Sequence, residues 1–227
     1  MSGFFRLSKI MALVTFVAFG IANAEIGIHS FTDPAVWPNN DNEDYSLGWE
    51  FAVTGSVTVD ALGYNYFYVP ELKFYGPQLE GPSVPLSGPL NSAHQVGIYD
   101  ASSQTLLASA TVTNASTGID GYLYTSLGSP VVLPSGDYWI VGTTLGPGDG
   151  WIFQADDIVT DSAIAYLTSG FTSGNGGALG FPASAAPDRQ YLEVNFMTSP
   201  VPEPGGLSLL GLGLLGLVAA SRRRSAR

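Results

Sequence analysis

The chain has 227 residues, with 19 acidic and 8 basic side chains, no cysteine and a formal net charge of −11. Most of the basic residues lie near the two ends, so residues 25–200 hold 18 acidic and 2 basic side chains, a formal charge of −16. Such an acidic body repels phosphate backbones, which excludes nucleic acid as a partner. The lack of cysteine excludes disulfides, thiolate metal sites and thiol nucleophiles.

The first 24 residues have the pattern of a secretory signal peptide. Arg6 and Lys9 form a positive segment, an apolar stretch follows, and Ala22 and Ala24 supply small side chains at a cleavage position. A permanent amino-terminal anchor is the alternative, but it needs a longer apolar segment of about 20 residues. We therefore predict that signal peptidase cuts after Ala24 and that the mature protein begins near Glu25.

The body shows no sustained 3.6-residue apolar period, and β-branched and aromatic residues recur in short runs between Gly, Pro, Asn and Asp. A turn at residues 134–137 is expected to divide one of these runs, and long loops are expected at residues 70–89 and 169–188. Many short strands without an internal repeat predict an all-β fold, a two-sheet β-sandwich with jelly-roll-like connectivity. The expected strands are residues 46–53, 56–69, 94–100, 105–113, 121–127, 130–144, 151–155, 163–168 and 191–197.

The order of three segments in the body carries a resemblance. The segments are "GWEFAVTGSVTVDALGY", "HQVGIYDASSQTLLASATV" and "SPVVLPSGDYWIVG", which fall within residues 47–142. Their order is similar to that of a β-sandwich domain of unknown function that recurs in exported bacterial proteins. The resemblance implies the fold and export, and no activity.

Catalytic residues are not grouped in a recognisable pattern. His29 and His94 are the available bases for a serine hydrolase, no G-x-S-x-G elbow is present, and both histidines suit strand-end or surface positions. A glycosidase needs two carboxylates across a cleft, for which Glu50 and Glu193 are one of many conceivable pairs. We therefore expect that the protein is not an enzyme.

The segment "NNDNED" at residues 39–44 concentrates oxygen ligands in a loop before the first clear strand. Carboxylates and carbonyls of this kind bind calcium, although the EF-hand spacing is missing. A solvated acidic loop is the alternative interpretation. No other cofactor is expected; the candidate calcium ligands are Asp41, Glu43 and Asp44, with Asp156, Asp157 and Asp161 as further acids.

Aromatic side chains are the other candidates for contact with a ligand. Tyr64, Tyr66 and Tyr68 alternate onto one face of an expected strand, and sugars stack on planar rings of this kind. Core packing explains the same alternation, and we favour it. Trp37 is expected in a loop and is the better candidate for an exposed carbohydrate contact. The core is expected to hold Trp49, Trp139 and Trp151.

The chain ends in a short apolar segment followed by arginines. Residues 205–220 reach about 24 Å as a helix at ~1.5 Å per residue, less than a hydrocarbon core of roughly 30 Å. A marginal transmembrane helix of this length suits temporary retention in a membrane. Positive residues stay on the cytoplasmic side, so the body is predicted to lie outside. The cytoplasmic stop is Arg222, Arg223 and Arg224.

Before this helix, Val201-Pro202-Glu203-Pro204 forms a stiff, extended segment, because each proline fixes its φ and restricts its predecessor. These four residues, the Leu/Gly-rich helix and the arginines resemble the PEP-CTERM sorting signal of exported Gram-negative bacterial proteins. The resemblance implies that a membrane-embedded exosortase recognises Pro202, Glu203 and Pro204, cuts near them, and passes the body to the outer surface. A plain tail anchor with a proline linker is the alternative.

Three segments are thus expected: a signal peptide at residues 1–24, an exported β-sandwich at 25–200 and a sorting signal at 201–227. The family setting implies exopolysaccharide and biofilm, with the protein held transiently at the inner membrane and then delivered to the surface or matrix. We expect a structural or adhesive role associated with exopolysaccharide. The alternatives are a carbohydrate-binding surface module, which could depend on calcium, and a glycan-active hydrolase.

Overall fold

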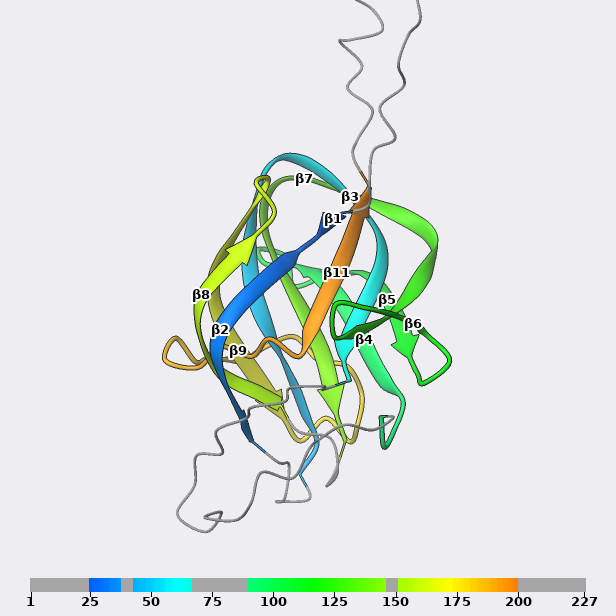
Figure 1. Cartoon of the computed structure of the whole chain (residues 1–227), viewed down its shortest axis with the longest axis vertical. Helices are drawn as coiled ribbons and strands as arrows, with labels where there is room; N and C mark the ends of the chain where they lie inside the picture. Colours follow the sequence, from blue (N-terminus) through cyan, green and yellow to red (C-terminus); the bar gives the residue numbers. More distant parts are fainter. Residues whose placement is uncertain (1–24, 38–42, 67–89, 146–150, 200–227) are drawn as a thin grey trace, which may run out of the picture.

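The structure is a computed structural model that describes residues 25–37, 43–66, 90–145 and 151–199. These residues form eleven strands and no helix, so the prediction of an all-β body is confirmed (Figure 1). The strands are β1 (Glu25–Ile26), β2 (Ile28–Trp37), β3 (Tyr45–Asn65), β4 (His94–Asp100), β5 (Leu106–Val112), β6 (Thr117–Ile119), β7 (Tyr122–Thr144), β8 (Trp151–Thr160), β9 (Ile164–Ser173), β10 (Ser184–Ala185) and β11 (Val194–Ser199).

Two long strands, β3 and β7, build the sandwich. They run antiparallel from Tyr45 opposite Thr144 to Asn65 opposite Tyr122, and both bend near Gly55, where the register shifts and the glycine φ is 88°. The first half of β3 pairs with β9 and the second half pairs with β11. Because strands that bend at a corner pass from one layer to the next, the single nine-stranded sheet folds into two layers.

One layer holds β10, β9, the first half of β3, the second half of β7, β4 and β5. The other layer holds β1, β11, the second half of β3, the first half of β7 and β6. The predicted β-sandwich is therefore confirmed at the level of its architecture. The finer expectation of a jelly-roll connectivity stays a prediction.

Three strand breaks expected from the sequence are wrong. Residues 54–55 lie inside β3, and residues 128–129 and 134–137 lie inside β7. At residues 54–55 and 134–137 the ladder continues, because Val53 stands opposite Gly136 and Ser56 stands opposite Pro134. Turn-forming residues on both strands coincide here, so the paired ribbon bends as a unit. Pro134 has no backbone N–H, so the bend leaves no donor of this residue without a partner. Its carbonyl accepts a hydrogen bond of 3.0 Å from the Tyr138 hydroxyl.

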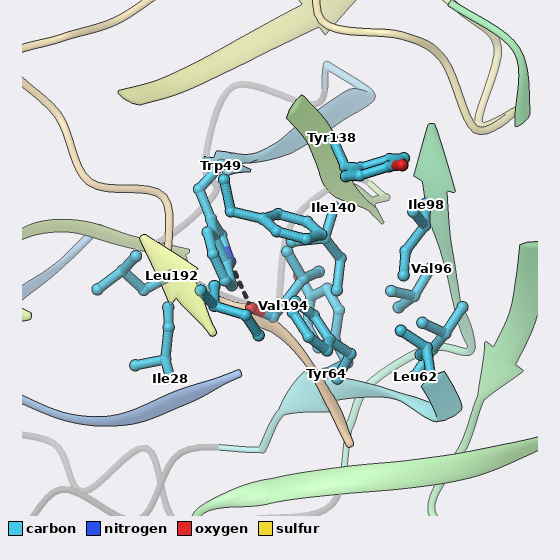
Figure 2. Close-up of a cluster of buried hydrophobic side chains, with 14 of the residues drawn as sticks. Ile28, Trp49, Leu62, Tyr64, Val96, Ile98, Tyr138, Ile140, Leu192 and Val194 are labelled. Atoms are coloured by element: carbon cyan, nitrogen blue, oxygen red, sulfur yellow. Dashed lines mark hydrogen bonds between the residues drawn. The ribbon is translucent and has the colours of Figure 1, made fainter. Parts of the chain in front are cut away.

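The hydrophobic core lies between the two layers. Trp49 and Phe51, from the first half of β3, face Phe196 of β11, with ring centroids 5.8 and 4.9 Å away. The Trp49 indole N–H crosses the core and donates to the Val194 carbonyl at 2.8 Å (Figure 2). The prediction that Trp49 and Trp139 are buried is confirmed, but Trp139 lies on the other face of β7, in a smaller cluster with Tyr99 and Val141. The side chain of Trp151 lies outside the description.

A small sheet of β2 and β8 closes one flank of this core (Figure 1). Ile28, Ile152 and Ala155 are buried in the main cluster. The Asn195 side chain fixes β2 to β11, since its Oδ1 accepts from the Ile28 N–H at 3.0 Å and its Nδ2 donates to the Ile28 carbonyl at 2.9 Å. The amino-terminal strands are thus attached to the carboxyl-terminal strand through a buried amide.

The predicted signal peptide, the 70–89 loop and the whole predicted sorting segment lie outside the described residues. Within the described ranges, no helix is long and apolar enough to cross a membrane. The flanking transmembrane helix therefore stays a prediction.

Candidate functional site

The first and last described residues lie together at one end of the sandwich. Glu25 of β1 pairs with Thr198 of β11, and the next residue, Ser199, stands opposite Thr58 of β3. Thr58 in turn stands opposite Val132 of β7. A row of three partly or fully exposed residues, Ser199, Thr58 and Val132, therefore crosses adjacent strands where the chain leaves the fold. We call this the exit row.

A comparison with family models identifies the segment behind the exit row. The PEP-CTERM protein-sorting motif matches residues 200–224, so the match begins directly after Ser199. The chain carries a PEP-CTERM sorting signal. Because this motif is the exosortase recognition signal, the protein is exported through the membrane to the cell surface, with exosortase as its processing partner. A comparison with curated proteins finds no match to the chain.

The PEP-CTERM match includes the residues to which the sequence assigned roles in sorting. Pro202, Glu203 and Pro204 lie at its start, and Arg222, Arg223 and Arg224 end it. All six lie outside the described residues, as do Ala22 and Ala24 at the expected signal-peptide cleavage site. Their individual roles stay predictions.

Near the exit row, two carboxyl groups share a hydrogen bond. Glu25 is exposed, and Asp161, which follows β8, is 5% exposed. The hydrogen bond to Asp161 and the charge of that residue raise the pKa of Glu25 above its usual range, while His29 opposes the shift. The segment that directly follows the expected signal-peptide cleavage site is thus held against the turn after β8.

A buried polar cluster surrounds His94, at the start of β4. Its ring stacks on Tyr64 from the opposite layer, with centroids 3.9 Å apart and planes 8° from parallel. Nδ1 contacts the Thr143 carbonyl at 2.5 Å, so it carries the proton, and Nε2 faces the Ser92 hydroxyl at 3.5 Å. The Tyr64 hydroxyl lies 3.1 Å from Thr144 Oγ1. The cluster joins the two layers through satisfied polar groups.

The pair of Ser92 and His94 is the arrangement closest to a nucleophile with a base. The His94 ring is 0% exposed, and its orienting group is a carbonyl rather than a carboxylate. A substrate cannot reach this base in the described geometry. The expectation of a strand-end position for His94 is confirmed, but a surface position is wrong; His29 is exposed as expected.

A second buried polar cluster surrounds Glu193, directly before β11. Its side chain is 0% exposed, and neither carboxyl oxygen has a hydrogen-bond partner of acceptable geometry in the described part of the chain. Burial raises the pKa of Glu193 to about 8, opposed slightly by its own backbone N–H. Desolvation raises the pKa values of Tyr122 and Tyr191, and the charge of ionised Glu193 adds to both shifts. Burial without a hydrogen-bond partner thus favours the protonated form of Glu193.

Tyr122 of β7 lies beside Glu193, and Tyr124 packs against Tyr122 with ring centroids 6.0 Å apart. Tyr122 donates its hydroxyl to the Leu192 carbonyl at 2.6 Å, and Asn65 contacts the same hydroxyl. The Tyr124 hydroxyl is buried and has no partner among the described residues. Desolvation raises the pKa of both tyrosines. Sequence reasoning missed this cluster because each of these residues also suits an exposed strand face.

The proposed pairing of Glu50 with Glu193 is not formed. Burial raises the pKa of Glu50, the charge of Asp137 raises it further, and a hydrogen bond from Trp139 lowers it. Glu193 instead lies beside Tyr122 and Tyr191. Glu50 alternates with the core residues Trp49 and Phe51, so its carboxyl faces away from the interior. The two carboxylates do not flank a common cleft.

The acids considered for calcium are dispersed. Asp41 lies outside the description, and the exposed Glu43 accepts a hydrogen bond of 2.8 Å from the Tyr45 hydroxyl. Asp44 comes directly before β3, at one end of the half-strand formed by residues 45–53. Asp161 lies at the other end of this half-strand, which is about 26 Å long at ~3.3 Å per residue. Grouping Asp44 with Asp161 is therefore wrong. Within the described ranges, no three His or carboxylate side chains could hold a metal together.

The aromatic candidates for carbohydrate contact differ in how far they are buried and in whether their side chains are described. Tyr64 is 0% exposed, which removes it as a contact and agrees with the core alternative. Tyr66 is half-buried against the core, and Tyr68 lies outside the description. Trp37 ends β2 opposite Trp151, so the expected loop is wrong; its side chain lies outside the description.

Proposed function

We propose that the released protein is a non-enzymatic, structural or adhesive component of the surface or biofilm matrix of a Gram-negative bacterium. In this role it associates with exopolysaccharide after exosortase has removed the tail. The observation that carries the proposal is the sorting motif placed directly behind the last strand of a folded β-sandwich. A complete domain followed at once by a sorting signal suits a cargo protein that works as a unit once delivered.

The chemistry of the described residues supports a role without catalysis. The buried base His94 has no open face, and the carboxylates Glu50 and Glu193 do not meet. The body is strongly acidic, with 18 acidic side chains in residues 25–200. Charge of this kind keeps an exported protein soluble and dispersed among hydrated polymers.

A carbohydrate-binding module is the second candidate. Tyr66 is the described aromatic residue that keeps part of its surface open near the expected tyrosine face. Calcium at Asp41, Glu43 and Asp44 would belong to this alternative. The ion would either connect the protein to the sugar or hold the loop in one conformation. A glycan-active hydrolase is the third candidate, and no described pair of carboxylates favours it.

Co-sedimentation with the host's own exopolysaccharide tests the proposal. The processed protein is purified from the cells that make it and mixed with the polysaccharide in calcium and in chelator, and the polymer is then examined for shortened chains. We expect co-sedimentation without shortening. Shortened chains would favour the hydrolase, and saturable, calcium-dependent binding of one defined glycan would favour the binding module. Absence of both binding and shortening would contradict the polysaccharide association.

A further inference from the structure

We propose that the exit row and the exposed segments of β3 and β7 beside it form a docking surface for the membrane-embedded enzyme that processes the tail. The inference rests on the proposed processing by exosortase and adds that the folded body, in addition to the linear motif, contacts the enzyme. The surface consists of Ser199, Thr58 and Val132, the exposed bend of β3 at residues 54–56, and the exposed residues 128–130 of β7, which lie at a second register shift between β3 and β7.

The first argument is distance. Pro202 follows Ser199 by three residues, so the two lie within about 11 Å of each other in any conformation of the chain. Val132 lies two strands away from Ser199, which is about 10 Å at the ordinary strand spacing. A protease cleft that holds Pro202 therefore lies at most about 11 Å from Ser199. This distance is similar to the distance between Ser199 and Val132. An enzyme wider than this distance meets the exit row.

The second argument is that the body cannot easily withdraw from the motif. Thr198 is paired on both sides, with Glu25 of β1 and with Val59 of β3. The neighbouring Phe196 is fully buried against Trp49. Lengthening the tether would require β11 to leave the sandwich, which exposes core side chains and ladder groups. The folded end of the molecule is thus presented together with the motif.

The third argument is the composition of this end. In a body with 18 acidic residues, the segments at 53–59 and 126–136 contain no charged side chain. Val132 is 59% exposed, more than any other exposed large hydrophobic residue in the described part of the chain. Asp60, opposite residues 127–130, and the exposed Glu25 lie at the edges of this surface, so its uncharged part is the exit row with residues 54–56 and 128–130. An apolar residue with few charges around it is typical of the centre of a protein contact, where charged groups are depleted. A lipid surface is a weaker candidate for this contact than the enzyme. The motif that the enzyme binds comes before the apolar segment, so the enzyme lies nearer to the body than the membrane does.

Substitution of Val132 by Glu in the full-length protein tests the contact. Tail removal is followed by pulse-chase in the host, and we expect it to slow about ten-fold, as for loss of one important contact residue. Leu167→Glu is the matched control, because Leu167 is 46% exposed in the middle of β9, and its tail removal should change less than two-fold. Resistance of the body to added protease verifies that both variants fold.

A flexible insertion separates docking from other causes. Twelve Gly and Ser residues placed between Ser199 and Pro200 would release the enzyme from the body, so Val132→Glu should then be processed as fast as the same insertion without it. Equal slowing by Val132→Glu and Leu167→Glu, or slowing that persists with the insertion, would overturn docking. Weaker membrane association of Val132→Glu in cells without the enzyme would indicate a lipid contact and would also overturn it. If the unsubstituted tail is never removed, the proposed processing itself fails.

Discussion

Two buried polar clusters occupy the same sandwich and are built in opposite ways. Around His94, both ring nitrogens face polar groups, and the stacked Tyr64 has its own contact to Thr144. Around Glu193, three buried oxygen atoms, two of Glu193 and one of Tyr124, have no partner in the described structure. Satisfied buried groups join layers and specify one packing, whereas unsatisfied groups make stability depend on protonation. The first cluster should be sensitive to mutation and the second to pH.

The largest expected effect is the pH dependence caused by Glu193. Between pH 4.5 and about 8 the folded protein holds the Glu193 proton, while the unfolded chain has released it. The unfolded state therefore binds fewer protons, and the free energy of unfolding falls as pH rises through this window. The whole shift corresponds to about 5 kcal/mol. Denaturant unfolding of the processed protein at a series of pH values measures it.

Glu193→Gln is the control for this pH effect. The amide cannot ionise, so stability between pH 4.5 and 8 should be flatter in this variant than in the unsubstituted protein. Glu43→Gln, at an exposed position, should leave the slope unchanged. A slope that is the same in all three proteins would mean that Glu193 is not the group that titrates.

Removal of the His94 ring should give the next largest effect. His94→Ala leaves a cavity beside Tyr64 and deprives the buried Thr143 carbonyl of its side-chain partner. The expected loss is about 3 kcal/mol of unfolding free energy, since a cavity and an unsatisfied group both contribute. Chemical denaturation at pH 6 measures it. A loss below about 1 kcal/mol would show that the cluster does not hold the layers together.

Removal of one hydroxyl from the His94 cluster should cost less. Tyr64→Phe keeps the ring stacked on His94 and removes the oxygen that lies 3.1 Å from Thr144 Oγ1. We expect a loss of about 1.5 kcal/mol, because a buried partner is left unsatisfied. Thermal unfolding followed by circular dichroism measures the change. An unchanged melting temperature would remove the distinction between the clusters.

The smallest effect is expected for the corresponding change in the Glu193 cluster. Tyr124→Phe removes a buried hydroxyl that has no partner among the described residues, so stability should be unchanged or higher by up to about 1 kcal/mol. The same melting experiment measures it next to Tyr64→Phe. A loss as large as that of Tyr64→Phe would indicate that the Tyr124 hydroxyl does have a partner.

Local patterns in the sequence predicted several elements well. The run at residues 94–100 is β4 as expected, and the run at 105–113 contains β5. Trp49, which falls in an expected strand, lies in the core as expected. Patterns with a period of two depend on neighbouring side chains in one strand, so they can be read without knowing the partner strand.

Positions that depend on a partner strand were missed. The bend at Gly55 looked like a break because turn residues are a local signal, while the continuing ladder to Gly136 is not. Likewise, Trp37 was expected in a loop because it precedes Pro38, but pairing with β8 extends the strand to that residue. Glu193 lay in an expected strand, and nothing in its neighbours indicates that both faces there are covered.

By itself, the sequence determined the β-rich class of the body and the sorting signal behind it. Both are encoded in contiguous residues: short β-branched runs in one case and the motif matched at residues 200–224 in the other. The tertiary structure alone decided that β1 and β11 meet, that the exit row is uncharged and that Glu193 is buried without a partner among the described residues. Those features depend on residues far apart along the chain, whose pairing is set by packing of the two layers rather than by any local preference.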